Sequence, residues 1–145
     1  MQLKDEIQKK RYKLLLIIGK PGSGKSKYLH NYSKENGIPI INLDDILGKK
    51  IPEGKDKEYV LSFMNNFVNS YSKDVLLIDK KSIVYEKDSN IDLLNFLENI
   101  AKEKIVIATW NGYTEDGKLY HLNNQQEIDY SYNLNSVDFA YIELL

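Results

Sequence analysis

The feature that most limits the fold is an apolar run, Leu14–Ile18, which passes directly into a glycine-rich segment and then into a helical pattern. An uninterrupted apolar run of this length is typical of a strand covered on both faces, as in parallel sheets flanked by helices. Residues 25–36 have the pattern of the helix that follows, and Gly37 stands where a left-handed residue ends many helices. The order predicted is therefore a buried strand, a tight turn and a helix.

The same alternation continues along the chain. Further apolar runs of strand length lie at 38–43, 75–78 and 105–110. Apolar residues recur with helical spacing over 58–71 and 91–102. Strands that alternate with helices predict a doubly wound α/β sheet.

The remaining segments add smaller elements. Residues 1–12 have the pattern of a short amphipathic helix, and 48–57, with its lysines and glycines, that of a loop. The sequence Glu-Asp-Gly at 115–117 predicts the turn of a β-hairpin over 113–122. Residues 138–145 predict a fifth, edge strand.

The glycine-rich segment reads Gly-Lys-Pro-Gly-Ser-Gly-Lys-Ser from Gly19 to Ser26, which fits the phosphate-binding loop (P-loop) at every fixed position. Its glycines let backbone N–H groups approach phosphate oxygens, and the following helix adds its positive end. Lys25 is expected to reach the β- and γ-phosphates, and the Ser26 hydroxyl to coordinate Mg²⁺. The residues predicted to bind ATP are Gly19, Lys20, Pro21, Gly22, Ser23, Gly24, Lys25, Ser26 and Lys27.

Two further polar residues follow predicted strands. Asp79 ends the run at 75–78 as a Walker B aspartate does, so it is predicted to share the Mg²⁺ ion with Ser26. Asn111 follows the next strand and is a candidate to position a water at the γ-phosphate, although a turn before Gly112 explains it as well. Lys25, Asp79 and Asn111 are the predicted catalytic residues.

The fold class that follows is a three-layer P-loop NTPase sandwich, with a mostly parallel sheet of about five strands, a C-terminal hairpin and no helical lid domain. The 145 residues are expected to form a single nucleotide-binding domain, 1–145. Their net charge of −1 gives no field that would indicate nucleic acid or an anionic membrane. With no cysteine and no apolar stretch of membrane-spanning length, the protein is expected to be soluble and cytoplasmic, with no membrane partner.

Two features of active P-loop ATPases are missing. Lys80 stands directly after Asp79, where a catalytic glutamate is common, and a charged lysine cannot accept a proton. Asp44, Asp45 and Glu86 are weak substitutes. Arg11 is the only arginine, and its place before the first predicted strand puts it at the far end of the sheet from the nucleotide. Slow or partner-dependent turnover is therefore expected.

Aromatic residues are concentrated near the C-terminus: Trp110, Tyr113, Tyr120, His121, Tyr130, Tyr132 and Tyr141. They are candidates for an exposed face that stacks on single-stranded nucleic acid or on a protein partner. Ordinary packing of the sheet and hairpin is the favoured interpretation.

The combined motifs resemble one known family. Residues 18–26, the Val-Leu-Leu-Ile-Asp segment at 75–79 and the Ala-Thr-Trp-Asn-Gly-Tyr-Thr-Glu-Asp-Gly segment at 108–117 resemble the BrxF family, the small P-loop proteins of type 3 bacteriophage-exclusion (BREX) defence systems. The resemblance implies a bacterial cytoplasmic nucleotide-binding component of an anti-phage complex. It also implies partners: a DNA methyltransferase, a helicase-like ATPase and a phosphatase-like protein.

Three functions are consistent with these observations. The first is an ATP-binding, weakly hydrolysing subunit that self-assembles or joins other defence proteins, with DNA contact through the assembly. The second is a small-molecule kinase, with Asp44 and Asp45 holding a substrate hydroxyl; the lack of an arginine after Arg11 argues against it. The third is an interaction module whose P-loop no longer functions.

Overall fold

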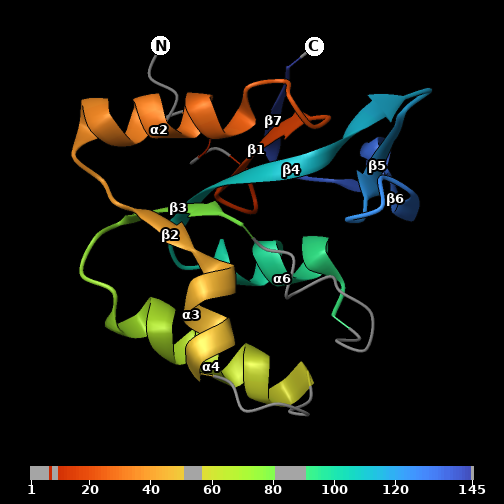
Figure 1. Ribbon diagram of the computed structural model, residues 1–145. Helices are drawn as coiled ribbons and strands as arrows, with labels where there is room; N and C mark the ends of the chain where they lie inside the picture. Colours follow the sequence, from red (N-terminus) through yellow and green to blue (C-terminus); the bar gives the residue numbers. More distant parts are fainter. Residues whose placement is uncertain (1–6, 8–9, 51–56, 81–90, 145) are drawn as a thin grey trace.

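A computed structural model describes residues 7, 10–50, 57–80 and 91–144, with five parallel strands at its centre in the order β2-β3-β4-β1-β7 (Figure 1). The elements are β1 Leu14–Gly19, α2 Lys25–Asn36, β2 Ile40–Asn42, α3 Leu43–Lys50, α4 Lys57–Ser70, β3 Val75–Asp79, α6 Leu93–Ile100, β4 Ile105–Glu115, β5 Lys118–Leu122, β6 Ile128–Asn133, the 3₁₀ turn Leu134–Ser136 and β7 Ala140–Glu143. The predicted lead-in helix over 1–12 lies almost entirely outside the described residues.

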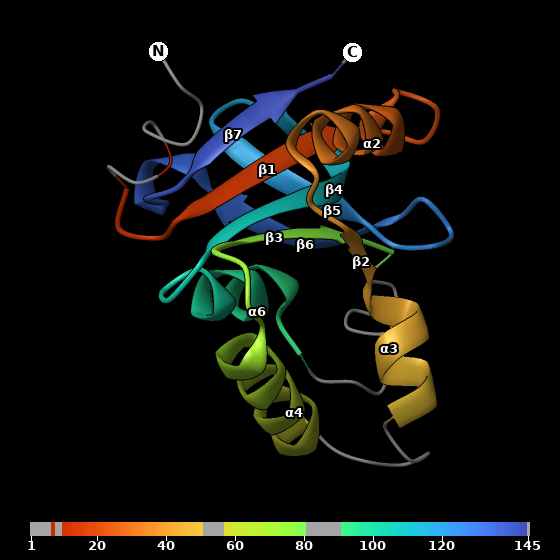
Figure 2. The same cartoon turned by 90° about the vertical axis from the view of Figure 1, so that its left-hand side faces the viewer.

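Helices cover both faces of this sheet, with α2 on one side and α4 and α6 on the other (Figures 1 and 2). Side chains along β1 alternate between the two layers, because successive residues of a strand point to opposite faces. Leu15 and Ile17 pack with Leu29 of α2, whereas Leu14 and Leu16 belong to the core on the α4 and α6 side. This three-layer, mostly parallel architecture confirms the predicted P-loop NTPase fold class. Within 91–144 the structure shows no helical lid domain.

The strand order decides which polar residues can meet. β4 lies between β1 and β3, and its parallel register sets Asn111 beside Gly19 and Ala108 beside Ile78. Because parallel strands deliver their carboxyl ends to one edge, the P-loop, Asp79 and the end of the buried part of β4 come together there.

The segment after β2 is helical where a loop was predicted. β2 ends at Asn42. The side-chain oxygen of Asn42 accepts a hydrogen bond from Asp45 N at 3.1 Å, so Asn42 caps the first turn of α3. Asp44 and Asp45 then lie in that turn, where acidic residues are favoured by the helix dipole. The prediction of a loop over 48–57 is wrong for 48–50 and for Lys57, which belong to α3 and α4; residues 51–56 lie outside the described part.

The predicted hairpin is present but is part of a larger antiparallel unit. β4 continues well beyond Trp110 to Glu115, turns through Asp116 and Gly117 with φ of 52° and 77°, and pairs with β5. A third strand, β6, which the sequence analysis missed, pairs with β5 on its other side. The predicted edge strand is confirmed as β7, which runs parallel to β1.

Replacing Gly112 by alanine is expected to lower the free energy of unfolding by about 1–3 kcal/mol, as overpacking does. An added Cβ would lie 1.9 Å from the carbonyl oxygen of Tyr120, the oxygen that accepts the Trp110 indole N–H at 3.0 Å. Backbone on one side and a buried ring on the other leave little room to adjust. Chemical denaturation measures the change. The exposed Lys118→Ala on the same hairpin serves as the control, and equal stability of the two variants would contradict the packing argument.

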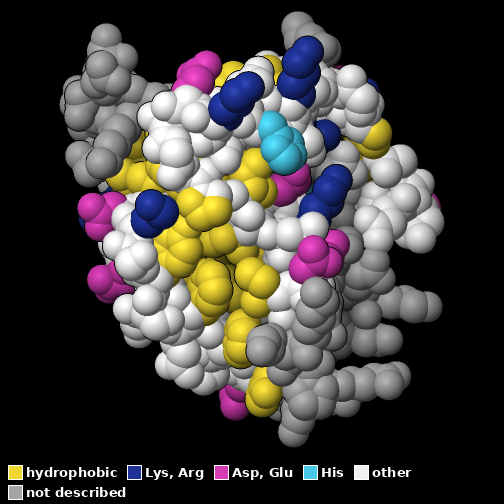
Figure 3. Space-filling model, turned by 60° about the vertical axis from the view of Figure 1, so that its left-hand side comes forward, with side chains coloured by type: hydrophobic (Ala, Val, Ile, Leu, Met, Phe, Trp, Pro, Cys, Tyr) yellow, Lys and Arg dark blue, Asp and Glu magenta, His cyan; other side chains and the backbone are white. Residues whose placement is uncertain are grey.

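The side of the molecule that lies left in Figure 1 is brought forward in Figure 3. There, hydrophobic side chains form a continuous band with lysines, acidic side chains and a histidine around it (Figure 3). In the part of the chain that the structure describes, no helix combines the length and apolar character needed to cross a bilayer.

Candidate functional site

The loop between β1 and α2 has the backbone geometry that its glycines predict. Gly22 and Gly24 have φ of 83° and 97°, in the left-handed region that residues with a side chain rarely adopt. A Cβ on Gly19 would lie 2.1 Å from the Ser23 hydroxyl oxygen, so the loop closes too tightly for any larger residue there. At the other end of α2, Gly37 has a φ of 66°, which confirms the left-handed residue predicted there.

Donors in this loop are prepared for an anion. Gly24 is the N-cap of α2 and offers no side chain to its N–H groups, and the first turn of α2 contains no acidic residue. The Ser23 hydroxyl is buried without a hydrogen-bond partner in the structure. Unpaired donors at a helix N-terminus are the features that bind phosphate oxygens, so the loop fits a polyphosphate.

Lys25 leaves this loop and curls back onto it. Its Nζ donates to the carbonyl oxygen of Lys20 at 3.0 Å. Burial lowers the pKa of the Lys25 ammonium; nearby Asp79 acts in the opposite direction, and nearby Lys80 adds to the lowering. An anionic ligand would favour the charged form of Lys25 and so raise its pKa again.

Asp79, at the end of β3, is only 7% exposed, and both of its carboxylate oxygens accept hydrogen bonds. Its Oδ2 accepts from the Ser26 hydroxyl at 2.9 Å. Its Oδ1 accepts from the Thr109 hydroxyl at 2.7 Å and from Lys80 N at 2.9 Å. The two residues predicted to share Mg²⁺ are therefore in direct contact. Thr109, which the sequence analysis missed, orients the carboxylate from the neighbouring strand β4.

These residues surround one cavity of about 330 Å³. Its walls are Pro21, Gly22, Lys25, Ser26, Asp79, Lys80, Thr109, Asn111 and His121. The cavity therefore joins a glycine loop, two lysines, a hydroxyl and a carboxylate, a combination suited to a phosphate chain with a divalent cation.

Residues 14–105 match the family model of an AAA domain, which is more than half of the chain and includes both the P-loop and Asp79. The chain belongs to the AAA domain family. It is therefore a nucleotide-binding protein of the P-loop class. No curated protein matches the sequence. The match covers the phosphate loop and Asp79. Strands β5, β6 and β7 of this AAA domain lie beyond the matched residues.

Asn111 lies on the cavity wall, as predicted, but its amide is tied to the hairpin. Its Nδ2 donates to the carbonyl oxygen of Leu122 at 3.1 Å and to Gln126 Oε1 at 3.3 Å. Lys27, by contrast, is exposed and is not among the residues that line this cavity. The roles of both residues remain predictions.

His121 is a wall residue of the AAA domain that the sequence analysis placed elsewhere. It is 1% exposed, and its Nδ1 lies 2.7 Å from Asp129 Oδ1. Its ring packs edge-on against Trp110, with centroids 4.9 Å apart. A carboxylate on Nδ1 holds the tautomer with the proton there, which makes Nε2 the basic nitrogen. No sequence signal indicated this pair, because it requires the register between β5 and β6.

The exposed aromatic face, the less favoured of the two interpretations, is wrong for its central members, because Trp110 is 0% exposed and His121 is buried. Tyr132 donates its hydroxyl to Asp92 Oδ1 at 2.8 Å, and burial together with this bond raises the pKa of Tyr132. Ordinary packing, the favoured alternative, is therefore confirmed for these residues.

Three other candidate catalytic groups, Arg11, Asp44 and Asp45, do not line the cavity. Arg11 precedes the amino end of β1 and packs over the Tyr12 ring, so it is at the opposite end of that strand from the P-loop, as predicted. Asp44 N donates to the carbonyl oxygen of Lys80 at 2.8 Å, but neither Asp44 nor Asp45 lines the cavity. Glu86 lies outside the described residues.

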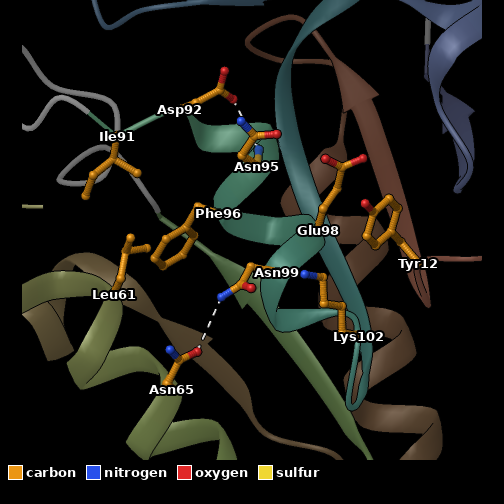
Figure 4. Close-up of a pocket in the computed structure, with 10 residues that line it drawn as sticks. All are labelled: Tyr12, Leu61, Asn65, Ile91, Asp92, Asn95, Phe96, Glu98, Asn99 and Lys102. Atoms are coloured by element: carbon orange, nitrogen blue, oxygen red, sulfur yellow. Dashed lines mark hydrogen bonds between the residues drawn. The ribbon is translucent and has the colours of Figure 1, made fainter. Parts of the chain in front are cut away.

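A separate hollow lies between α4 and α6, and Figure 4 shows the residues around it. Two carboxylates, Asp92 and Glu98, line it together with Lys102. Burial raises the pKa of Glu98; Asp92 adds to the effect, and Arg11 and Lys102 oppose it. Its negative groups would repel a triphosphate, so this hollow does not compete with the P-loop cavity as the nucleotide site.

Proposed function

We propose that this AAA domain is an ATP-binding, weak or partner-dependent ATPase subunit of a bacterial anti-phage (BREX) defence complex. The observation that carries the nucleotide part is the convergence of Lys25, Ser26 and Asp79 on one cavity beside an anion-ready loop. The resemblance of residues 75–79 and 108–117 to the BrxF family supports the defence role.

The predicted ligands suit ATP with Mg²⁺. The Ser26 hydroxyl and the Asp79 carboxylate are the oxygen ligands that this ion prefers, and Mg²⁺ usually takes one or two protein ligands beside phosphate oxygens and water. Consistent with so few, the described residues contain no group of three His, Asp or Glu that could hold a metal by themselves. When bound, Mg²⁺ neutralises charge on the β- and γ-phosphates. Lys25 and the loop amides hold those phosphates in place.

In this proposal, two residues that line the cavity bear on the rate of turnover, Lys80 and His121. Lys80 occupies the position after Asp79 and lines the cavity as a second cation, so it can offset charge on the transferred group but cannot take a proton. Among the lining residues, His121 is the side chain suited to accept the proton of an attacking water, with Asp129 stabilising the imidazolium that results.

Replacing His121 by asparagine is expected to lower the rate of ATP hydrolysis about 100-fold, the lower end of what a general base contributes. An asparagine amide can keep the contact with Asp129, whereas the Nε2 position is lost. ATP affinity is expected to stay within about twofold, because His121 does not belong to the phosphate loop. Steady-state turnover together with calorimetric binding separates the two quantities, and His30→Asn on exposed α2 is the control. Unchanged turnover would remove His121 from the mechanism.

We infer from the BrxF resemblance that turnover depends on assembly, either with other defence proteins or with further copies of the chain. DNA contact would arise within that assembly. The kinase alternative draws on the same P-loop cavity, and the inert interaction module requires that the cavity bind nothing.

Measurement of Mg-ATP binding and turnover for the native chain and Lys25→Ala, alone and with candidate partners and DNA, tests the proposal. Nucleotide binding with turnover that appears or rises on assembly is the expected result. Phosphate transfer from ATP to a metabolite would replace the ATPase by the kinase. Absence of binding at millimolar ATP would overturn the proposal in favour of the interaction module.

A further inference from the structure

A second cavity, of about 630 Å³, adjoins the P-loop cavity that Lys25, Ser26 and Asp79 line. It lies on the other side of the loop. The two share Pro21 and Gly22 as a common wall. The remaining walls come from Lys20 and Ser23, from the part of β4 that continues into the hairpin, and from the end of β7. This volume is within the range of small-ligand sites.

The direction of a bound triphosphate follows from the strand order. Asp79 and Ser26 fix the end that carries the β- and γ-phosphates near β3, so the α-phosphate must extend away from β3. In the order β3-β4-β1-β7, the opposite end of the edge is β7. Three strand spacings, about 14 Å, separate the two ends. The second cavity therefore lies where the nucleoside leaves the phosphate loop.

The chemistry of this second cavity suits a nucleoside. The Tyr113 ring has the Lys20 ammonium 4.8 Å from its centre on one side and the Tyr120 ring at 5.1 Å as a further neighbour. Tyr113 lines the cavity, so a base that takes the place of the Lys20 ammonium on this ring would stack there. Near it, the Glu143 carboxylate accepts from Thr114 N at 3.1 Å and from the Thr114 hydroxyl. A carboxylate has about four acceptor positions, so Glu143 can accept further donors.

We propose that the second cavity binds the nucleoside part of the nucleotide, with the base stacked on Tyr113 and the ribose hydroxyls donating to Glu143. This inference rests on the proposed ATP-binding function. It adds two contact residues, Tyr113 and Glu143, that lie beyond the part of the chain that matches the AAA domain, and it makes the ligand a ribonucleotide.

Comparison of Mg-ATP with Mg-tripolyphosphate tests the site, because tripolyphosphate has the phosphates and lacks the nucleoside. Tyr113→Ala is expected to weaken ATP binding at least fivefold, as loss of one base stack does, and to leave tripolyphosphate binding unchanged. Tyr113→Phe keeps the ring and is expected to bind ATP like the native chain. Tyr59→Ala, an exposed tyrosine on α4 that does not line this cavity, is the control.

The outcomes separate the two levels of inference. If the native chain binds tripolyphosphate and Tyr113→Ala leaves the affinity for ATP unchanged, the nucleoside site in the second cavity is overturned and the P-loop function stands. Failure of the native chain to bind either ligand would overturn the P-loop function itself.

Glu143→Gln supplies a second test that does not depend on the ring. The native chain is expected to prefer ATP to 2′-deoxy-ATP about tenfold, the worth of one charge-assisted hydrogen bond. The glutamine variant keeps an oxygen for Thr114 but is expected to lose most of this preference. Retention of the full preference would exclude Glu143 as the ribose acceptor.

Discussion

Lys25→Ala is expected to lower kcat/KM for ATP hydrolysis about 1,000-fold and to weaken Mg-ATP and Mg-tripolyphosphate binding about 10- to 100-fold. A hydrogen bond to a charged group contributes about 1.5–3 kcal/mol, and a further loss arises because charge on the γ-phosphate grows in the transition state. The fold should not suffer. Burial lowers the pKa of this ammonium, so its charge is disfavoured where it lies, and its side-chain bond is to its own loop, at Lys20 O.

Isothermal calorimetry and steady-state kinetics measure these losses, and thermal unfolding checks the fold. Lys34→Ala, exposed in the last turn of the same helix, removes an equal charge far from the phosphate loop and is the matched control. If both variants bound ATP equally well, the ammonium of Lys25 would have no special part in binding.

Asp79→Asn is expected to lower turnover about 100- to 1,000-fold, since a metal ligand supplies several kcal/mol of transition-state stabilisation. The asparagine oxygen can still accept from Thr109 and from Lys80 N, so β3 and β4 should remain in register. What is lost is the negative charge that a divalent cation requires. The stimulation of ATP binding by Mg²⁺ should therefore largely disappear.

Binding titrations with Mg²⁺ and with EDTA separate this effect from a general loss of affinity. In EDTA the variant should bind ATP at least as well as the native chain, because Lys25 and the loop amides are unchanged and one carboxylate no longer repels the phosphates. Asp74→Asn, an exposed acid just before the same strand, is the control. A variant that kept its Mg²⁺ stimulation would exclude Asp79 as a ligand.

The phosphate end of this site could be predicted from sequence because its determinants are local. Glycine spacing fixes the backbone of the loop, and an apolar run that ends in Asp79 fixes a buried strand with an acid at its end. The missed helix after β2 also had a local signal, the Asn-Leu-Asp-Asp segment from Asn42 to Asp45, in which a capping residue precedes acids in the first turn.

The contacts that join distant segments around the site could not be predicted, because they depend on which strands become neighbours. Thr109 reaches Asp79 only because β4 lies between β1 and β3. His121 reaches Asp129 only through the β5–β6 register, and Glu143 reaches Thr114 only because β7 joins the sheet beside β1. Periodicity reports which face a side chain takes within its own strand, but not which strand will be its neighbour.

The phosphate loop bonds in part to its own atoms, since Lys25 Nζ is bonded to Lys20 O and the Ser26 hydroxyl to Asp79. The Lys25 ammonium keeps two further donors and the Ser26 hydroxyl keeps its oxygen lone pairs, so a ligand can add to these contacts without breaking them. A single inorganic phosphate fills few of these positions, whereas a triphosphate with its cation fills many, so short anions gain little binding energy here. Abundant free phosphate should therefore be a poor competitor for this protein.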